Sequence, residues 1–233
     1  MIDRVGTDGD VRRCVVAVDG PSGSGKSTVS RRLAKALDAA YLDTGAMYRA
    51  VTWAVLRAGV DLADPDAIAK VAAEVRLESG TDPDHPYIRA DGVAVDQPIR
   101  GPAVTKAVST VAAVPAVRRQ LVAEQRRIIA AADRIVVEGR DIGQVVAPDA
   151  DLKVFLTASA AERARRRSEQ DATDREATAA DLARRDQLDS TRATDPLRRA
   201  EDAIELDTTG MDIDAVVDRL RALVAERVSG ADQ

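Results

Sequence analysis

The chain has 233 residues, of which 45% are hydrophobic and 31% are charged, and its formal net charge is −5. This length and composition predict one globular domain, or one domain with an insertion, and exclude wholesale disorder. The acidic balance and an aromatic content of 2% argue against a general binder of nucleic acid or of acidic membranes. The N-terminal stretch is polar and no apolar run approaches about 20 residues, so a soluble, cytoplasmic protein is expected.

Short apolar runs alternate with helical patterns along the chain, an order typical of a parallel β-sheet covered by helices. The expected core strands are residues 14–18, 40–42, 134–137, 152–156 and 203–206. The expected helices are residues 26–37, 46–58 and 213–228, where apolar side chains recur every three or four residues. The first strand holds the single cysteine, Cys14, which is expected to be buried and inert.

The middle of the chain follows a different pattern. Residues 74–101 show period-two alternation punctuated by Gly and Pro, which predicts a small antiparallel insertion. Asp91-Gly92 is a favoured two-residue hairpin turn, and helices are expected to follow as far as residue 131. Residues 158–189 are highly charged, contain no Gly or Pro, and are expected to be helical.

This organisation predicts two units. The first is a core made of residues 12–73 and 132–228, and the second is the insertion at residues 74–131. Residues 1–11 and 229–233 are expected to be flexible tails.

The segment from Gly20 to Ser27 matches the P-loop pattern G-x-x-x-x-G-K-[ST] and joins an expected buried strand to an expected helix. Glycines let backbone N–H groups converge on phosphate oxygens, and the helix N-terminus adds a favourable partial charge. Lys26 is expected to reach the β- and γ-phosphates of a nucleotide, and the Ser27 hydroxyl to bind Mg²⁺. The predicted ATP-binding residues are Gly20, Pro21, Ser22, Gly23, Ser24, Gly25, Lys26, Ser27 and Thr28.

A flexible Gly/Ser turn before a surface helix is the structural alternative for this segment, and two other nucleotide-binding interpretations fit it less well than a P-loop for ATP does. A dinucleotide-binding fingerprint needs a third glycine at position 28, where the chain has threonine. A GTPase usually needs an Asn-Lys-x-Asp motif to recognise guanine, and the chain contains no asparagine. ATP is therefore the expected nucleotide.

Residues 41–49 (YLDTGAMYR) are the first candidate for binding a phosphate acceptor. Asp43 and Thr44 lie where a strand ends and a helix begins, which suits a helix N-cap. Tyr48 and Arg49 follow about one turn later and face the sheet edge at which open α/β sheets bind ligands. The alternative is an ordinary cap followed by a surface arginine.

Residues 136–143 (VVEGRDIG) are the second candidate, because an apolar strand delivers three charged side chains to the same edge. Arg140 is expected to bind a phosphate through both arms of its guanidinium group, and Asp141 to accept hydrogen bonds from an amino group. Glu138 is expected to organise Mg²⁺ through water. A structural Arg–Asp turn is the alternative.

The charged helical region supplies the remaining candidates. Arg185, Asp189 and Arg192 are spaced four and three residues apart, which places them along one helical face. Arg163, Arg166 and Arg167 belong to a charged cluster in the same helical region. A solvated helix with Glu–Arg pairs is the alternative for each of these arginines.

Four stretches together resemble bacterial cytidylate kinases, which belong to the nucleoside-monophosphate kinase group of P-loop proteins. They are GPSGSGKST, LDTGAMYR, EGRDIG and RDQLDSTR followed by DPL, in the family's order and at similar separations. The resemblance covers residues 15–206 and implies a three-layer α/β/α P-loop fold. The fold would have a mainly five-stranded parallel sheet, a nucleotide-binding insertion near residues 74–101 and a helical lid at about residues 158–189.

The resemblance also implies roles for individual residues. Ser109 would contact the cytosine amino group, a contact that Asp141 would share, and Arg118 would contact the pyrimidine ring. Arg49, Arg140 and Arg192 would hold the phosphate and sugar of the acceptor nucleotide. Asp189 would accept a ribose hydroxyl, with Arg185 orienting it, and the Thr44 hydroxyl replaces a serine found in some relatives.

The expected reaction is Mg²⁺-dependent phosphoryl transfer from ATP to CMP or dCMP by a monomer that binds neither nucleic acid nor membranes. Lys26, Arg140 and the three lid arginines would be catalytic. Two alternatives stay open at this point: a P-loop kinase for another small acceptor such as UMP or shikimate, and a nucleotide-binding regulator without an acceptor.

Overall fold

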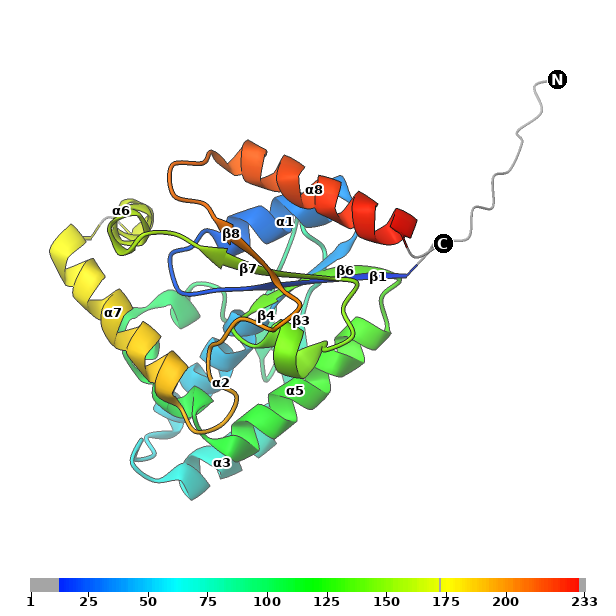
Figure 1. The fold of residues 1–233 in the computed structure, drawn as a ribbon. Helices are drawn as coiled ribbons and strands as arrows, with labels where there is room; N and C mark the ends of the chain where they lie inside the picture. The colour runs from blue at the N-terminus through cyan, green and yellow to red at the C-terminus, as the bar shows by residue number, and fades with distance from the viewer. Residues whose placement is uncertain (1–12, 172, 231–233) are drawn as a thin grey trace.

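Five parallel strands form the centre of the fold in the computed structural model, which describes residues 13–171 and 173–230 (Figure 1). The strand order is β2-β6-β1-β7-β8. The strands are β1 (Cys14–Asp19), β2 (Ala40–Asp43), β6 (Arg134–Gly139), β7 (Leu152–Thr157) and β8 (Ile204–Asp207). The predicted five-stranded parallel sheet is confirmed, with β8 beginning and ending one residue later than expected.

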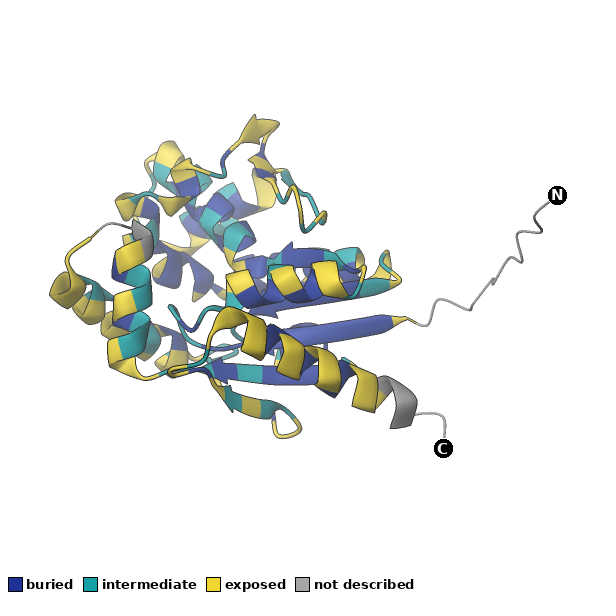
Figure 2. Cartoon of the chain, turned by 90° about the horizontal axis from the view of Figure 1, so that it is seen from above, coloured by how far each residue is buried: buried dark blue, intermediate teal, exposed yellow. Residues whose placement is uncertain are grey.

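Helices cover both faces of this sheet, because its strands are apolar on both sides. In β1, Val15 and Ala17 belong to one hydrophobic cluster, whereas Val16 and Val18 belong to the other. The second cluster lies under α1 (Lys26–Ala36) and α8 (Ile213–Gly230). Figure 2 shows the strands as a buried layer between helices whose outer faces are exposed. Cys14 is buried at the start of β1, as predicted.

The first cluster lies under the helices of the other face (Figure 1). These are α2 (Thr44–Ala58), α3 (Pro65–Glu74), α4 (Pro102–Ala112) and α5 (Pro115–Ala130). The α2 helix begins two residues earlier than expected and ends at Gly59, as predicted, with the left-handed φ of 66° that favours glycine. The α3 helix was not predicted, although Asp64 caps it and Pro65 opens it.

A second, three-stranded antiparallel sheet lies between α3 and α4 in the chain. Its strands are β3 (Leu77–Ser79), β4 (Ile88–Ala90) and β5 (Val93–Ala94). Asp91 and Gly92 connect β4 to β5 with φ values of 51° and 76°, which are the left-handed conformations of a type I′ turn. The predicted antiparallel insertion and its hairpin are therefore confirmed. A short 3₁₀ helix, η1 (Pro98–Arg100), leads from this sheet into α4.

The charged region at residues 158–189 is two helices rather than one continuous helix. They are α6 (Ala160–Asp171) and α7 (Arg175–Thr191), and they lie at the end of the molecule opposite the start of β1 and the end of α8 (Figure 1). The Asp174 carboxylate accepts a hydrogen bond from the Ala177 N–H at 2.7 Å and so begins a new helix without any Gly or Pro.

The chain between β6 and β7 forms a π-helix, η2 (Ile142–Val146), which was not predicted. No helix in the described ranges is long and apolar enough to cross a membrane. The predicted tail at residues 1–11 lies outside the described residues, as do residues 231–233 of the predicted C-terminal tail, whereas α8 extends to Gly230.

Candidate active site

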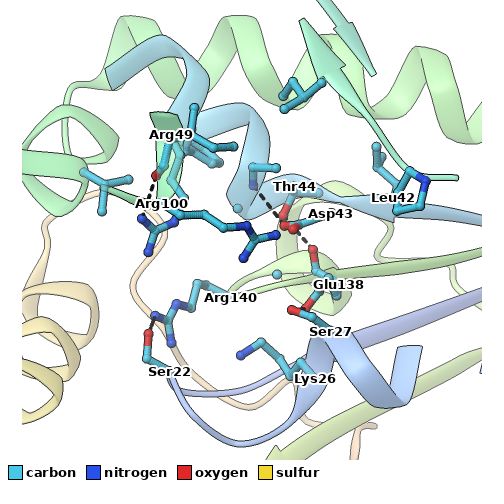
Figure 3. A pocket seen from close by; sticks show the side chains of 18 of the residues that line it. Ser22, Lys26, Ser27, Leu42, Asp43, Thr44, Arg49, Arg100, Glu138 and Arg140 are labelled. Atoms are coloured by element: carbon cyan, nitrogen blue, oxygen red, sulfur yellow. Dashed lines mark hydrogen bonds between the residues drawn. The ribbon is translucent and has the colours of Figure 1, made fainter. Parts of the chain in front are cut away.

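A cavity of about 720 Å³ opens at the carboxyl ends of β1, β2 and β6 (Figure 3). The P-loop, the start of α2, the antiparallel insertion, the turn after β6 and the helices α6 and α7 all contribute to its lining. Lysine and arginine outnumber aspartate and glutamate among the lining residues, although the whole chain has a net charge of −5. The cavity is therefore a positively charged site of the size of a small-molecule site.

The P-loop forms one end of the cavity. Gly23 and Gly25 adopt left-handed φ values of 78° and 89°, and α1 begins immediately after them at Lys26. This geometry directs the first N–H groups of the helix toward the cavity, where they can bind phosphate oxygens. The Lys26 ammonium donates to the carbonyl oxygen of Pro21 at 2.8 Å, and burial lowers its pKa.

The first glycine of the loop cannot be replaced without a clash. Gly20 has a φ of 148°, and an added Cβ would lie 2.2 Å from the carbonyl oxygen of Leu156 in β7. We expect Gly20→Ala to lower the free energy of unfolding by about 3 kcal/mol or more in urea denaturation. Gly92→Ala is the matched control, because its φ is also positive but nothing lies within 4 Å of the added Cβ, so only about 1 kcal/mol should be lost. Equal losses would contradict the predicted clash.

Glu138 links the P-loop to the end of β6. Its carboxylate accepts a hydrogen bond from the Ser27 hydroxyl at 2.9 Å and another from the buried Tyr41 hydroxyl. Burial raises the pKa of Glu138, Asp43 adds to this effect, and Lys26 opposes it. Figure 3 shows Lys26, Ser27 and Glu138 on the same side of the cavity.

The donor set around Ser27 fits Mg²⁺ bound with a nucleotide. No group of three or more His, Cys, Asp or Glu residues gathers in the described part of the chain to hold a metal by itself. Magnesium usually keeps several waters and binds substrate phosphates, and it needs only one or two protein oxygens. The Ser27 hydroxyl, with Glu138 beside it, provides such oxygens.

Arg140 joins the P-loop to the opposite end of the cavity. Its guanidinium donates to the carbonyl oxygen of Gly20 at 3.0 Å and to the Ser22 hydroxyl at 2.7 Å (Figure 3). The same group lies 3.1 Å from the Asp189 carboxylate on α7. Asp189 in turn accepts a hydrogen bond from the Ser109 hydroxyl of α4 at 3.1 Å.

A buried ion pair forms the far end of the cavity. Arg118 on α5 is 2% exposed and donates to the Asp141 carboxylate, and its guanidinium lies over the Tyr48 ring, 5.5 Å from the ring centroid. Burial opposes the charge of Arg118, yet Asp141 and Tyr48 together with Asp195 raise its pKa. The pair therefore presents a fixed cationic donor beside a carboxylate acceptor.

Four residues that line the cavity have a buried side-chain atom without a hydrogen-bond partner among the described residues. The atoms are Tyr48 Oη, Ser79 Oγ, Arg185 Nε and Arg192 Nη2, the last of which lies in an ion pair with Asp141 at 3.5 Å. Buried polar groups in proteins nearly always have partners, and leaving one unpaired costs free energy. Unpaired donors converging on one cavity therefore indicate a site for a polar ligand.

Comparison with known proteins places this chain. The family model for cytidylate kinase matches residues 16–226. The chain belongs to the cytidylate kinase family. It is 58% identical to the cytidylate kinase of Rhodococcus jostii over 226 residues, which cover 95% of this chain and 98% of the relative. It is 59% identical to that of Nocardia farcinica over 220 residues, which cover 92% and 95%.

A solved structure supports the fold alone. The crystal structure of an uncharacterized protein from Eubacterium ventriosum matches with a TM-score of 0.50 at 12% identity, covering 91% of this chain and 99% of that one.

Most of the predicted site residues of this cytidylate kinase family member line the one cavity. The residues predicted to act on ATP that line it are Ser22, Gly23, Gly25, Lys26, Ser27, Thr28, Glu138, Arg140 and Arg167. The residues predicted to bind the second substrate that line it are Asp43, Thr44, Tyr48, Arg49, Ser109, Arg118, Asp141, Arg185, Asp189 and Arg192. Asp43 is the predicted N-cap of α2, and the Thr44 hydroxyl donates to the carbonyl oxygen of Glu138 at 2.7 Å. Their roles toward a bound substrate stay predictions.

The three arginines that were predicted to belong to a lid make different contacts. Arg163 donates to the Ser22 carbonyl oxygen at 3.1 Å, and Arg166 donates to the Ser24 carbonyl oxygen at 3.4 Å and to Thr208. Both therefore hold the outside of the P-loop. Arg167 lines the cavity. Gly20, Pro21 and Ser24 of the predicted ATP-binding residues are not among those that line the cavity, although the carbonyl oxygens of Gly20 and Pro21 accept hydrogen bonds from Arg140 and Lys26.

Sequence reasoning missed several residues of the site. Asp19 accepts the N–H groups of Ile142 and Gly143 at 2.8 Å each and so fixes the turn that carries Asp141, and burial raises its pKa to about 6. Arg100 extends from η1 into the cavity lining (Figure 3). An acidic residue directly before a P-loop is a visible signal for Asp19, whereas no local signal distinguishes Arg100 from other arginines.

Proposed function

We propose that this protein transfers the γ-phosphoryl group of ATP to CMP or dCMP, with Mg²⁺, and releases ADP and CDP or dCDP. One observation carries the proposal: a single cavity connects a P-loop to a second set of buried cations and unpaired donors that ends in a carboxylate. The curated relatives at 58% and 59% identity are cytidylate kinases, which supports the same acceptor.

Phosphoryl transfer depends on alignment and on neutralising charge rather than on covalent participation by the protein. In the proposed mechanism, the P-loop N–H groups and Lys26 hold the β- and γ-phosphates of ATP. Arg140 is placed between the P-loop and Asp189, so it reaches the region where donor and acceptor phosphates would meet. The acceptor phosphate is already mostly a dianion near pH 7, since its second pKa is about 6, so no general base is required.

Magnesium, when bound, neutralises negative charge on the β- and γ-phosphates. Ser27 would hold it directly and Glu138 through water. The unpaired donors of Arg185, Arg192 and Tyr48 would bind the phosphate and ribose of the acceptor, together with Arg49. Burial lowers the pKa of Arg49 to about 9 and that of Arg185 to about 10, so both stay cationic at neutral pH.

The base end of the cavity has the chemistry to choose cytosine. The Asp141 carboxylate accepts a hydrogen bond from the 4-amino group of cytosine, with Ser109 and Arg118 beside the ring. Uracil carries a carbonyl oxygen at that position, which faces the carboxylate as acceptor against acceptor. A site built around buried hydrogen-bonding groups rejects such a mismatch strongly.

We also propose that α6 and α7 act as the lid and that residues 74–131 act as the acceptor-binding insertion. Arg167, Arg185 and Asp189 reach the cavity from the lid, and residues such as Tyr87, Arg100 and Ser109 reach it from the insertion. The monomeric state and the cytoplasmic location stay predictions.

An acceptor panel tests the proposed activity. ADP release is measured at fixed ATP and Mg²⁺ with CMP, dCMP, UMP, AMP and shikimate as acceptors. We expect the largest kcat/KM with CMP or dCMP and only slow ADP release without an acceptor. Faster turnover with UMP or shikimate would reassign the acceptor, and ATP binding without stimulation by any acceptor would indicate a regulator.

A further inference from the structure

Arg118 lies between two carboxylates that come from different parts of the chain. Its Nη2 donates to Asp141, as described above, and its Nε donates to Asp195 Oδ2 at 2.7 Å. Asp195 follows α7 and lies 77 positions after Arg118 in the sequence. Its side chain is 28% exposed, whereas that of Arg118 is 2% exposed. Asp195 is the first residue of the DPL stretch that follows RDQLDSTR, and no function is predicted for it from the sequence.

The backbone around Asp195 is held by other contacts. Its carbonyl oxygen accepts a hydrogen bond from Arg192 Nε at 2.6 Å, and the Leu197 N–H donates to the Asp189 carbonyl oxygen at 2.8 Å. Asp195 has a left-handed φ of 48°, which aspartate, asparagine and glycine tolerate better than other residues. The turn is thus held through main-chain carbonyl oxygens, one of them bound by the Arg192 side chain, and the Asp195 carboxylate is left to contact Arg118.

The hydrogen bond from Arg118 Nε to Asp195 determines how many hydrogen bonds Arg118 can donate to Asp141. An arginine pairs with a carboxylate most strongly through two parallel N–H···O bonds, and Nε with Nη2 is one edge that makes them. Asp195 occupies Nε, so Arg118 offers Asp141 a single bond, to Oδ2. The other oxygen, Asp141 Oδ1, forms an ion pair with Arg192 Nη2 at 3.5 Å, which is longer than a typical hydrogen bond, so it has no hydrogen-bond donor from Arg118.

We propose that Asp195 is a specificity-determining positioning residue, which holds Arg118 so that Asp141 Oδ1 stays available to the amino group of a cytosine base. This inference rests on the proposed function, because it names what prepares the base end of that same site. Without the Asp195 carboxylate, the guanidinium rotates to pair Nε and Nη2 with both oxygens of Asp141. The acceptor that distinguishes cytosine from uracil is then occupied by the protein itself.

Two substitutions separate the carboxylate from the backbone. Asp195→Gly keeps a residue that tolerates the left-handed φ and removes the acceptor, whereas Asp195→Asn keeps both the φ and an oxygen that accepts from Nε. Asp202→Asn is the matched control, because Asp202 lies in the same segment after α7 and pairs with Lys153 through both carboxylate oxygens, at 3.0 and 2.8 Å. The Asp202→Asn control tests whether the loss of another contact in the segment after α7 is enough to alter recognition of the base.

The measurements are kcat and KM with CMP and with UMP at saturating ATP and Mg²⁺, calorimetric titration of CMP without ATP, and thermal unfolding. For Asp195→Gly we expect KM and Kd for CMP to rise about tenfold, as for one lost charge-assisted hydrogen bond. The ratio of kcat/KM for CMP to that for UMP should fall by a similar factor, with kcat for saturating CMP within about twofold of the wild type. Asp195→Asn and Asp202→Asn should stay near the wild-type ratio.

A wild-type ratio in a folded Asp195→Gly variant would overturn the inference. So would an equal loss in Asp202→Asn, or a loss in Asp195→Asn as large as in Asp195→Gly. Failure of the proposed function would appear elsewhere, since the wild-type protein itself would then show no CMP-stimulated turnover and no preference for CMP over UMP. The two failures are therefore distinguishable in the same experiment.

Discussion

Lys26→Ala is expected to lower kcat by about 10²–10³-fold, which is the usual cost of removing one preorganised group that stabilises transition-state charge. Lys26 follows the last glycine of the P-loop, and its ammonium reaches back to the Pro21 carbonyl oxygen across the mouth of the loop. Burial lowers its pKa, and a partly buried charge acts more strongly on a nearby phosphate than a charge in open water does. The measurement is initial-rate kinetics with ATP and CMP at saturating concentrations.

The fold should survive this substitution. An alanine in the first turn of α1 is a good helix former, and the lost side chain leaves a solvent-accessible cavity rather than a hole in the core. Lys70→Ala, at an exposed position on α3, is the matched control for the loss of one positive charge and should keep wild-type kcat. Near-normal turnover in Lys26→Ala would remove this lysine from the catalytic machinery.

Asp141→Ala is expected to reduce both stability and the preference for CMP over UMP. Asp141 is buried and pairs with Arg118, which is itself almost inaccessible. Removing one partner of a buried ion pair commonly costs 3–5 kcal/mol, and Arg118 keeps Asp195, so a loss of about 3 kcal/mol in urea denaturation is expected. The acceptor for the cytosine amino group disappears at the same time, which should lower the ratio of kcat/KM for CMP to that for UMP by about tenfold or more.

The comparison for this substitution is Asp181→Ala. Asp181 is an exposed carboxylate on α7 that pairs with Arg184 at 2.7 Å, and exposed pairs of this kind contribute little. It should leave stability within about 0.5 kcal/mol of the wild type and leave the substrate ratio unchanged. If folded Asp141→Ala kept the wild-type preference for CMP, another group would have to recognise the base.

The parts of the fold that were predictable from sequence have local causes. A strand buried on both faces must be apolar throughout, so β1, β6 and β7 stand out from their surroundings. Asp91-Gly92 supplies the two left-handed residues of a hairpin. By contrast, α3 buries only Ile68 and Ala72, and two apolar positions are too few to give a recognisable helical periodicity in the sequence. The break before α7 depends on one side-chain bond from Asp174, which composition does not reveal.

The candidate site also has one part that local sequence predicts and one part that it does not. The P-loop is a continuous motif whose geometry follows from its own glycines. The far end is assembled by pairs that lie 77 to 80 residues apart, such as Arg118 with Asp195 and Ser109 with Asp189. Nothing local specifies which carboxylate meets which arginine, so those pairings required the folded chain.

Ser22 is held from two sides: its hydroxyl by Arg140 at the end of β6, and its carbonyl oxygen by Arg163 on α6. An outward movement of α6 would break the Arg163 attachment and leave the Ser22 carbonyl oxygen without that donor. By thermodynamic reciprocity, a nucleotide that binds more tightly to the loop as shaped here would favour the inward position of α6 by the same free energy. Nucleotide release and outward movement of α6 would then be coupled, and a probe on either would report on the other.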